Sequence, residues 1–362
     1  MEHHRLNSHP YIRNARSTVL IRCLAALIAG LSMVAGNAAA STLWVANADS
    51  KTLTEFPSKL KAKNARVISD STDLDGASTI AFQGGKLWVT NFNANTIVAL
   101  TPSQVRKRKT ALTAAVIISE DTGSNLNGPE GLVFDSAGNM WVGAEHSGKI
   151  LVYAPTQFAT SGSPTPQVIL DGKTITFSEP SHMAFDGSGN LWVIDEARAN
   201  GNGGGGEIFK YSSAQILALT AGTNNVDPVF GIGLNAFNHL EALAFDGSGN
   251  MFLADEQGNN IYKFAASELN GIGLEQSPTP AAVLGASSLA GPCSMSLDGP
   301  YGVAFDGGGN LFVSNASTGG GCSGSVAVFS ASSIGANGNP MPITFISSKL
   351  DSPNDLTFGP TF

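Results

Sequence analysis

The sequence predicts an all-β protein built as a six-bladed β-propeller, and three observations support this prediction. An eight-residue phrase of the form F-D-x-x-G-N-x-(W/F) recurs at residues 134–141, 185–192, 245–252 and 305–312. Alternating apolar residues flank every copy, which is typical of a β-hairpin around a tight turn. The final aromatic residues of the copies stand 51, 60 and 60 residues apart, a spacing that indicates a series of small repeated sheets.

Each repeat predicts four strands, which we call a, b, c and d in chain order. Strands a and b form the hairpin, and the aspartate of the phrase is expected to bond the turn backbone rather than calcium; these residues are Asp135, Asp186, Asp246 and Asp306. Strand c follows at 149–155, 206–212, 260–266 and 325–331, and strand d at 166–170, 227–232, 280–284 and 341–346. A sheet that is apolar on both faces is stable only between neighbours, so the sheets should pack side by side.

Two shorter copies complete the ring. Residues 77–91 form a further a–b hairpin, whereas residues 42–56 supply strands b and c without a strand a. The missing strand stands at the other end of the chain, at residues 353–360. We therefore predict one propeller domain over residues 41–362, with four antiparallel strands per blade. The C-terminal strand should join the N-terminal blade and so close the ring without a free edge.

Residues 1–40 are expected to be a signal peptide. Arg13, Arg16 and Arg22 precede the apolar run 23–35, and small residues at Ala38 and Ala40 mark a cleavage site. The apolar run is shorter than the ~20 residues that span a bilayer. We therefore expect an exported protein, secreted or periplasmic, with no transmembrane span after cleavage, and we expect it to be a monomer.

The charge balance excludes some classes of partner. The whole chain has a net charge of −8; the first 40 residues hold four arginines and one glutamate, so the remainder has 16 basic and 27 acidic residues and a net charge of −11. Such a surface disfavours nucleic acid and anionic membranes. Only Cys293 and Cys322 follow the signal peptide, and in an exported protein they predict one disulfide, with two free thiols as the alternative.

Hairpin geometry predicts which residues surround one mouth of the central channel. The turns of the repeated phrase all lie on one face, so strand a begins and strand b ends on the opposite face. The second residues of the a strands include Glu130, Glu241, Tyr301 and Asn354, His182 is a third residue, and the strand-b ends include Asn47, Asn91, Asp195, Asp255 and Asn315. We predict that these polar residues bind a ligand, although the strand-b residues could instead cap loops.

A divalent cation is the cofactor that this residue set favours. Carboxylates, amides and one imidazole are ligands of hard or borderline cations, so calcium, magnesium, manganese and zinc all stay open. The candidate metal ligands are Glu130, His182, Glu241 and Asn354, and the first three are also the candidate catalytic residues. Counting back from the turn places His182 opposite Asp195, which would fix the imidazole tautomer. A solvated polar rim is the alternative.

The segment MFLADEQGNNIYKF at 251–264 resembles the NHL-repeat signature. This resemblance extends through the repeats and implies a six-bladed propeller. The senescence-marker-protein/gluconolactonase family holds a metal with a Glu and an Asn at the starts of a strands, which Glu130 in PEGL and Asn354 in PNDL resemble. The family's Asp has no clear equivalent here. Virginiamycin-B-lyase-like propellers use His and Glu with magnesium, which Glu130, His182 and Glu241 resemble in type, although those proteins have seven blades.

Two functions remain open from the sequence. The first is an exported binding module whose channel-mouth face takes a small molecule, a protein or a glycan. It is favoured because repeats on this fold are recognisable without a complete catalytic set. The second is a divalent-metal-dependent hydrolase or lyase, lactonase-like, with Glu130, His182 and Glu241 at its site.

Overall fold

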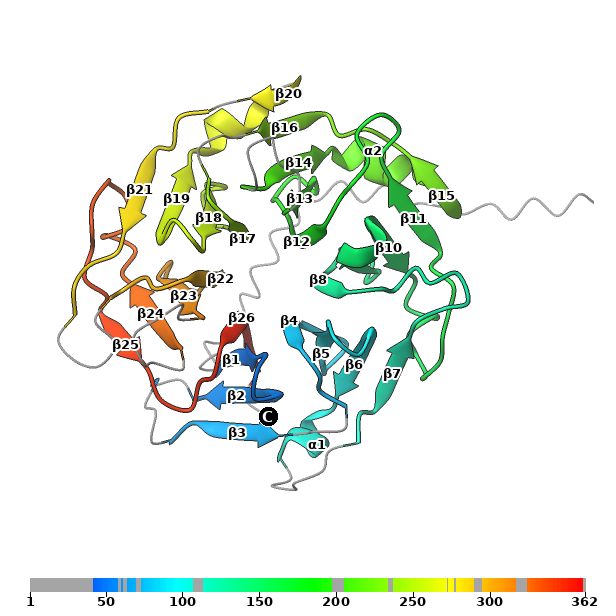
Figure 1. The fold of residues 1–362 in the computed structure, drawn as a ribbon, viewed down its shortest axis with the longest axis horizontal. Coiled ribbons are helices and arrows are strands. Elements are labelled where there is room, and N and C mark those ends of the chain that lie inside the picture. The colour runs from blue at the N-terminus through cyan, green and yellow to red at the C-terminus, as the bar shows by residue number, and fades with distance from the viewer. Residues whose placement is uncertain are drawn as a thin grey trace, which may run out of the picture.

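The computed structural model describes residues 42–57, 60, 64–69, 73–106, 113–196, 205–233, 237–271, 273–276, 278–289, 295–316 and 324–360. Six twisted sheets stand around a central axis like the blades of a propeller (Figure 1). The six-bladed, almost entirely β architecture predicted from the repeats is confirmed. The proposed signal peptide, Cys293 and Cys322 lie outside the described residues. Within the described part, no helix is long and apolar enough to cross a membrane.

Blades 1 and 2 lie where the two ends of the domain meet. Blade 1 consists of β26 (Pro353–Gly359), β1 (Thr42–Asn47), β2 (Thr52–Phe56) and β3 (Arg66–Ser69). Blade 2 consists of β4 (Ala77–Gln83), β5 (Lys86–Asn91), β6 (Thr96–Leu100) and β7 (Val116–Ser119), with α1 (Pro102–Arg106) before its last strand. β26 pairs antiparallel with β1, with Leu43 opposite Phe358, so the predicted closure of the ring by the C-terminal strand is confirmed.

Blades 3 and 4 follow around the ring. Blade 3 consists of β8 (Pro129–Phe134), β9 (Met140–Ala144), β10 (Lys149–Tyr153) and β11 (Val168–Asp171), with η2 (Glu145–Ser147) after β9. Blade 4 consists of β12 (Pro180–Phe185), β13 (Leu191–Asp195), β14 (Glu207–Tyr211) and β16 (Phe230–Gly233), with α2 (Ser213–Ala218) after β14.

Blades 5 and 6 complete the ring. Blade 5 consists of β17 (Leu240–Phe245), β18 (Met251–Asp255), β19 (Asn260–Phe264) and β21 (Ala282–Gly285), with η3 (Ala266–Asn270) after β19. Blade 6 consists of β22 (Pro300–Phe305), β23 (Leu311–Asn315), β24 (Ser325–Phe329) and β25 (Thr344–Ile346). The innermost strands β26, β4, β8, β12, β17 and β22 each contact the next around the axis.

The outer edges of two blades differ from the predicted four strands. β15 (Gly222–Asn225) pairs parallel with β11 of blade 3, and β20 (Gly273–Gln276) pairs parallel with β16 of blade 4. Each added strand comes from the segment between strands c and d of the following blade. It covers backbone groups that an outermost strand would otherwise leave unpaired, and it ties adjacent blades together.

The two aromatic positions of the repeated phrase hold neighbouring blades together. In each interface, the Trp or Phe of strand b contacts the Phe of strand a in the next blade, at ring-centroid distances from 4.8 to 6.2 Å. The pairs are Trp44–Phe82, Trp88–Phe134, Trp141–Phe185, Trp192–Phe245, Phe252–Phe305 and Phe312–Phe358. Aromatic pairs of this kind contribute about 0.5–1.5 kcal/mol beyond the burial of their surface, so the phrase recurs because every interface needs the same pair.

The aspartate of the phrase organises its own turn, as predicted. In blade 4, Asp186 accepts hydrogen bonds from the backbone of Ser188 and Asn190, from Asn190 Nδ2 and from Trp192 Nε1, at 2.8–3.0 Å. Gly189 has a φ of +76°, which only glycine adopts without strain. The turn therefore has its polar groups paired internally.

A β-bulge interrupts strand a at the opposite end of each hairpin. In blade 4 the register shifts between Pro180 and Met183, and comparable shifts occur at the start of strand a in the other five blades. Bulges bend a strand and redirect its side chains. Here they fall on the second and third residues of strand a, which are the residues predicted to surround the channel mouth.

Candidate functional site

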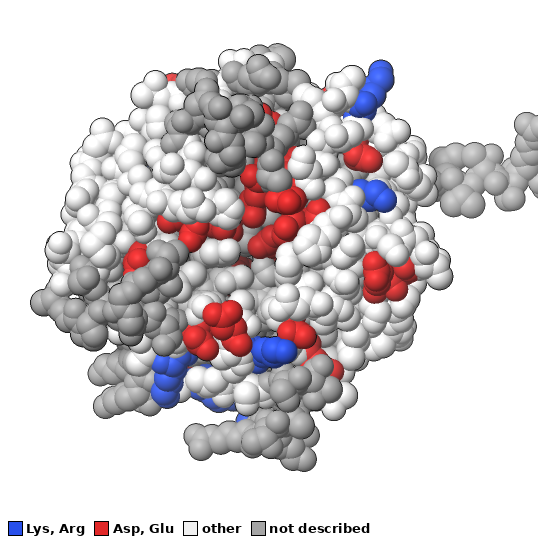
Figure 2. All heavy atoms as spheres, in the orientation of Figure 1, with Lys and Arg blue, Asp and Glu red and all other residues white. Residues whose placement is uncertain are grey.

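The face opposite the repeated turns carries a hollow at the centre of the ring. Figure 2 shows Asp and Glu side chains gathered in this hollow. Three consecutive blades supply the acidic residues: Glu130 comes from β8, Glu241 from β17, and Glu196 directly follows β13. The mouth is therefore asymmetric, because the second residues of strand a in blades 6, 1 and 2 are Tyr301, Asn354 and Ser78.

Four side chains converge in this hollow, and the structure unites the three residues predicted as catalytic. Glu130, His182 and Glu241 come together with Glu196, and each offers a ligand atom that lies within 4.8 Å of the others. We call these four residues the primary cluster. Glu130, His182 and Glu241 are buried, with 8%, 6% and 1% of their surface exposed.

His182 is held by blade 2, not by Asp195. Its Nε2 lies 3.3 Å from Thr79 Oγ1, and its buried Nδ1 has no hydrogen-bond partner. The predicted His182–Asp195 pairing is wrong: the register that pairs Met183 with Val193 would place Ser181 opposite Asp195, and the bulge in β12 places Pro180 there instead. Burial lowers the pKa of His182 to about 4, so the imidazole is neutral at pH 7 and presents a free nitrogen lone pair when Nε2 carries the proton.

The carboxylates of the primary cluster are buried and poorly satisfied. Oε2 of Glu241 and Oε1 of Glu196 have no hydrogen-bond partner. Burial raises the pKa of Glu130 and of Glu196 well above the usual range, and neighbouring carboxylates raise both further. Burial also raises the pKa of Glu241, although His239 and the facing Tyr301 hydroxyl oppose this shift. The protein thus gathers carboxyl groups where water cannot stabilise their ionised form.

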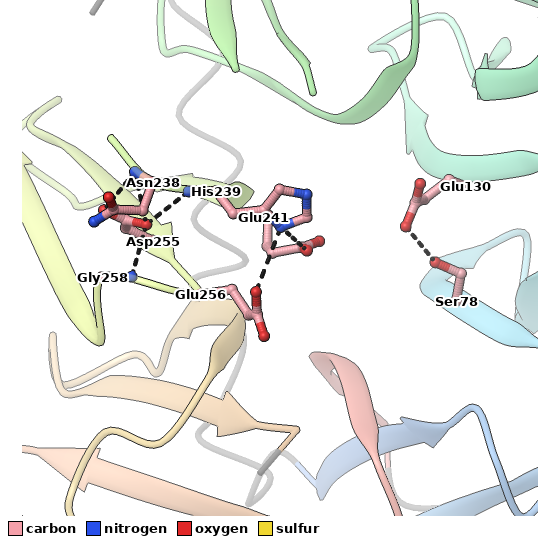
Figure 3. A network of polar contacts seen from close by, with 8 residues as sticks. All are labelled: Ser78, Glu130, Asn238, His239, Glu241, Asp255, Glu256 and Gly258. Atoms are coloured by element: carbon pink, nitrogen blue, oxygen red, sulfur yellow. Dashed lines mark hydrogen bonds and ion pairs between the residues drawn. The ribbon is translucent and has the colours of Figure 1, made fainter. Parts of the chain in front are cut away.

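A second group of titratable side chains shares Glu241. His239 Nδ1 lies 2.8 Å from Glu241 Oε1 and 3.5 Å from Glu256 Oε2. We call His239, Glu241 and Glu256 the rim cluster, because the side chain of His239 is 31% exposed whereas that of Glu241 is 1% exposed. Figure 3 shows these three residues together on the blade 5 side, with Glu130 and Ser78 across the channel.

Two acidic residues of these clusters were not predicted from the sequence. Glu196 and Glu256 each directly follow the last residue of a strand b, and Glu145 occupies the same position in blade 3. The prediction considered only the last residue of each strand b, and these glutamates are the residues that follow. The signal was present as the repeated dipeptide Asp-Glu at 195–196 and 255–256.

The predicted strand-b residues brace the loop that leads into strand a. Asp195 accepts hydrogen bonds from the backbone of Ser178 and Glu179, and Asp255 accepts them from the backbone of Asn238, His239 and Gly258. The amide oxygens of Asn47, Asn91 and Asn315 accept backbone hydrogen bonds in the corresponding loops. These contacts position the site indirectly, and a ligand-binding role for these five residues stays a prediction.

Tyr301 and Asn354 lie on the neutral side of the mouth, and both are half-buried. The Tyr301 hydroxyl faces Glu241, and burial followed by the nearby carboxylates raises its pKa. The backbone carbonyl of Asn354 accepts a hydrogen bond from Ser314 Oγ at 3.0 Å. A role for Asn354 as a metal ligand stays a prediction.

The primary cluster fits a divalent cation. Three carboxylates and one neutral imidazole form a donor set that hard and borderline cations accept. His182 Nδ1, Glu196 Oε1 and Glu241 Oε2 are polar atoms without hydrogen-bond partners, and a cation would satisfy them all. Ser78 Oγ lies 3.4 Å from Glu130 Oε1, and Thr90 Oγ1 donates to the Glu130 backbone carbonyl at 2.8 Å. Blade 2 therefore supports ligands that belong to blades 3 and 4.

Comparisons with known proteins show the fold. No protein-family model matches the sequence, and no curated protein is significantly similar. Among solved structures, a protein provisionally named a gluconolactonase matches at 14% identity with a TM-score of 0.51, over 78% of this chain and 81% of its own. A chain of the nidogen/laminin complex matches at 14% identity with a TM-score of 0.57, over 88% and 98%.

Virginiamycin B lyase from Staphylococcus aureus also has a similar fold. It matches at 11% identity with a TM-score of 0.52, over 88% of this chain and 87% of its own. These similarities confirm a propeller of the architecture shared by gluconolactonase-like and lyase-like proteins. At such identities the shared fold does not define the chemistry, and membership of the NHL-repeat group stays a prediction.

Proposed function

We propose that the protein is a divalent-metal-dependent hydrolase or lyase that acts on a small molecule at the acidic mouth of its channel. One observation carries the proposal: the primary cluster brings four ligand-bearing side chains together with buried polar atoms that lack hydrogen-bond partners. A pure binding surface does not require buried, mutually repelling carboxylates, which cost stability. The enzyme is therefore favoured over the binding module.

The chain's own residues have distinct roles in this proposal. Glu130, His182, Glu196 and Glu241 would hold the cation, which would polarise a carbonyl or phosphoryl oxygen and make bound water more acidic. His239 stands on the exposed side of Glu241, where its imidazole would face a bound substrate. Tyr301 faces the same carboxylate from the neutral side of the mouth. The substrate would lie between these two sides.

Neutral lactones and esters are the substrates to test first. The gluconolactonase-like structure shares the fold, and Glu130 stands at the start of strand a, as the resemblance to that family implies. The group of six glutamates at this mouth, Glu130, Glu145, Glu179, Glu196, Glu241 and Glu256, would repel anions. Uncharged substrates with a polarisable carbonyl therefore fit the site best.

Metal analysis tests the proposal. The protein, purified without a histidine tag, is dialysed against Mn²⁺ and its bound metal is measured by mass spectrometry. We expect stoichiometric metal in the parent protein and in Glu268→Gln, which removes an exposed carboxylate from η3 of blade 5. We expect a large loss in Glu130→Gln/His182→Gln, together with loss of turnover in a lactone and ester screen.

The opposite result would support the binding module. If the double variant binds as much Mn²⁺ as the parent, the primary cluster is not a metal site. If both proteins are also inactive in the screen, the mouth should be tested against protein and glycan partners. The fold shared with a chain of the nidogen/laminin complex makes protein ligands the first class to try.

Export is part of the proposal. The basic flank, apolar run and small-residue site of residues 1–40 favour cleavage and secretion or delivery to a periplasm. The N-terminus of protein recovered from fractionated cells would test this. A mature chain that begins near residue 41 outside the cytoplasm supports export, and an intact N-terminus in the cytoplasm rejects it.

A further inference from the structure

The rim cluster places one imidazole against two carboxylates. His239 Nδ1 lies 2.8 Å from Glu241 Oε1 and 3.5 Å from Glu256 Oε2, and each of the three side chains offers a ligand atom within 4.8 Å of the others. One imidazole carries at most one positive charge, so it cannot balance both carboxylates when they are ionised. A divalent cation held by the same three side chains would balance them.

We propose that the rim cluster is a second divalent-cation site and that the centre is binuclear, with Glu241 as the bridging carboxylate. Glu241 belongs to both clusters, its Oε1 faces His239 of the rim cluster, and its Oε2 has no hydrogen-bond partner. One oxygen can therefore serve each cation. The inference rests on the proposed function, since the bridge requires a cation in the primary cluster as well.

Burial separates this arrangement from an ordinary acidic surface patch. Glu241 is 1% exposed, and its carboxylate lies between the two clusters. A carboxylate buried this deeply costs several kcal/mol unless its charge is compensated. Within the described residues, no lysine or arginine forms an ion pair with Glu241 or Glu256, and the two carboxylates share His239 as their partner.

The donor chemistry indicates the class of cation. The rim cluster offers one imidazole nitrogen and carboxylate oxygens from Glu241 and Glu256, a mixed set that suits manganese or zinc better than calcium. His239 is more exposed than the buried ligands of the primary cluster, so the rim cation would meet the substrate first. Paired cations in hydrolases hold the attacking and leaving oxygens together.

Mn²⁺ stoichiometry tests the binuclear centre. Equilibrium dialysis of the full chain should give about two Mn²⁺ ions per chain, and electron paramagnetic resonance should show the coupled spectrum of a pair, since paired sites lie only ~4 Å apart. His239→Gln/Glu256→Gln should reduce the stoichiometry to about one and abolish the coupling. Glu268→Gln, a charge-matched change in the same blade, should retain both ions.

The outcomes distinguish the two proposals. One uncoupled ion that survives His239→Gln/Glu256→Gln but is lost in Glu130→Gln/His182→Gln rejects the rim site and leaves the proposed function intact. One ion that shows the reverse dependence rejects the primary cluster and the binuclear centre. No bound Mn²⁺ in a folded parent protein rejects both. Thermal unfolding of each variant without metal verifies that the propeller is intact.

Discussion

Carboxylates at the two ends of the hairpin formed by strands a and b differ in their hydrogen bonding. At the turn end, Asp135 and Asp186 each accept four hydrogen bonds from their own turn and from the following Trp. At the mouth end of blade 5, Glu241 Oε2 has no hydrogen-bond partner and Oε1 is paired with His239, although Glu241 is almost fully buried. The repeated hairpin therefore carries carboxylates that stabilise the fold at one end and a carboxylate that destabilises it at the other.

This contrast separates structural repetition from function. The turn aspartate is repeated in blades 3 to 6, because each of these hairpins has the same turn, whose donors require an acceptor. The mouth residues vary from blade to blade, and the acidic ones gather in blades 3 to 5. In a repeat protein, the positions that break the pattern on one face are the ones that define a site, whereas the repeated positions define the scaffold.

The largest expected effect is a pair of stability changes with opposite signs. Asp186→Ala leaves the donors of the turn without partners, and we expect the free energy of unfolding to fall by about 2–4 kcal/mol. Glu241→Gln removes a buried charge near other carboxylates, and we expect the metal-free protein to gain about 1–2 kcal/mol. Urea unfolding at pH 7.5 in the presence of a chelator measures both.

The same two variants test whether Glu241 at the mouth destabilises the metal-free protein. If Glu241→Gln destabilises the metal-free protein as Asp186→Ala does, then the carboxylate has a structural partner and the contrast between the two ends is lost. Asp246→Ala is the control within blade 5, since it removes three hydrogen bonds at the turn end of the hairpin that carries Glu241.

Bound metal should change the effect of Glu241 on the stability of the protein from destabilising to stabilising. A cation that binds only the folded state adds about 2.7 kcal/mol at a free concentration 100-fold above its dissociation constant. We expect Mn²⁺ to raise the melting temperature of the parent protein and of Glu268→Gln, but not of Glu241→Gln. Scanning fluorimetry with and without Mn²⁺ measures this, and an equal rise in all three proteins would contradict it.

An intermediate effect should appear in the pH dependence. Asp355 is buried at the mouth end of β26, where burial raises its pKa to about 7 and the Ile80 and Leu356 amides oppose that shift only in part. Because its folded-state pKa exceeds its unfolded value, its contribution to stability is complete below about pH 4 and is lost as the pH rises towards 7.

Asp355→Asn isolates this contribution. The variant should show a smaller loss of unfolding free energy between pH 4 and pH 7 than the parent protein does. Denaturant unfolding across that range, in chelator, measures the slope. Parallel slopes for the two proteins would mean that Asp355 is ionised in the folded state, and that the Ile80 amide alone is sufficient to stabilise the charge.

The fold could be predicted from the sequence because its determinants are local and repeated. The turn aspartates, the aromatic pairs and the strand alternation recur in copy after copy, so each one supports the others. The site was predicted only in part. Glu130, His182 and Glu241 were found because they begin strand a, but Glu196 and Glu256 stand in connections, where periodicity gives no position.

The wrong pairing of His182 has a physical cause. The predicted register was one residue off, since the observed pairing of Met183 with Val193 would place Ser181 opposite Asp195. A β-bulge then shifts strand a by one more residue, so that Pro180 stands there. No turn or glycine signal at Pro180–Met183 marks that bulge in the sequence. Contacts between blades, such as Thr79 with His182, join residues 103 positions apart and depend on how the sheets pack.

The smallest expected effect concerns that contact between blades. Thr79 Oγ1 lies 3.3 Å from His182 Nε2, and the Thr79 backbone is bound to Thr90 Oγ1 at 2.9 Å. If Nδ1 is the metal-binding atom, Nε2 carries the proton and donates to Thr79, which fixes the ring.

Thr79→Val keeps the shape and removes the acceptor, so we expect Mn²⁺ affinity to fall about 10-fold. Thr79→Ser should restore most of it, because the hydroxyl returns. Calorimetric titration of the three proteins measures the affinities, and nitrogen-15 resonances of His182 report the tautomer directly. Equal affinity in Thr79→Val would show that packing alone orients the imidazole, and blade 2 would then support the centre only through Ser78 and Thr90.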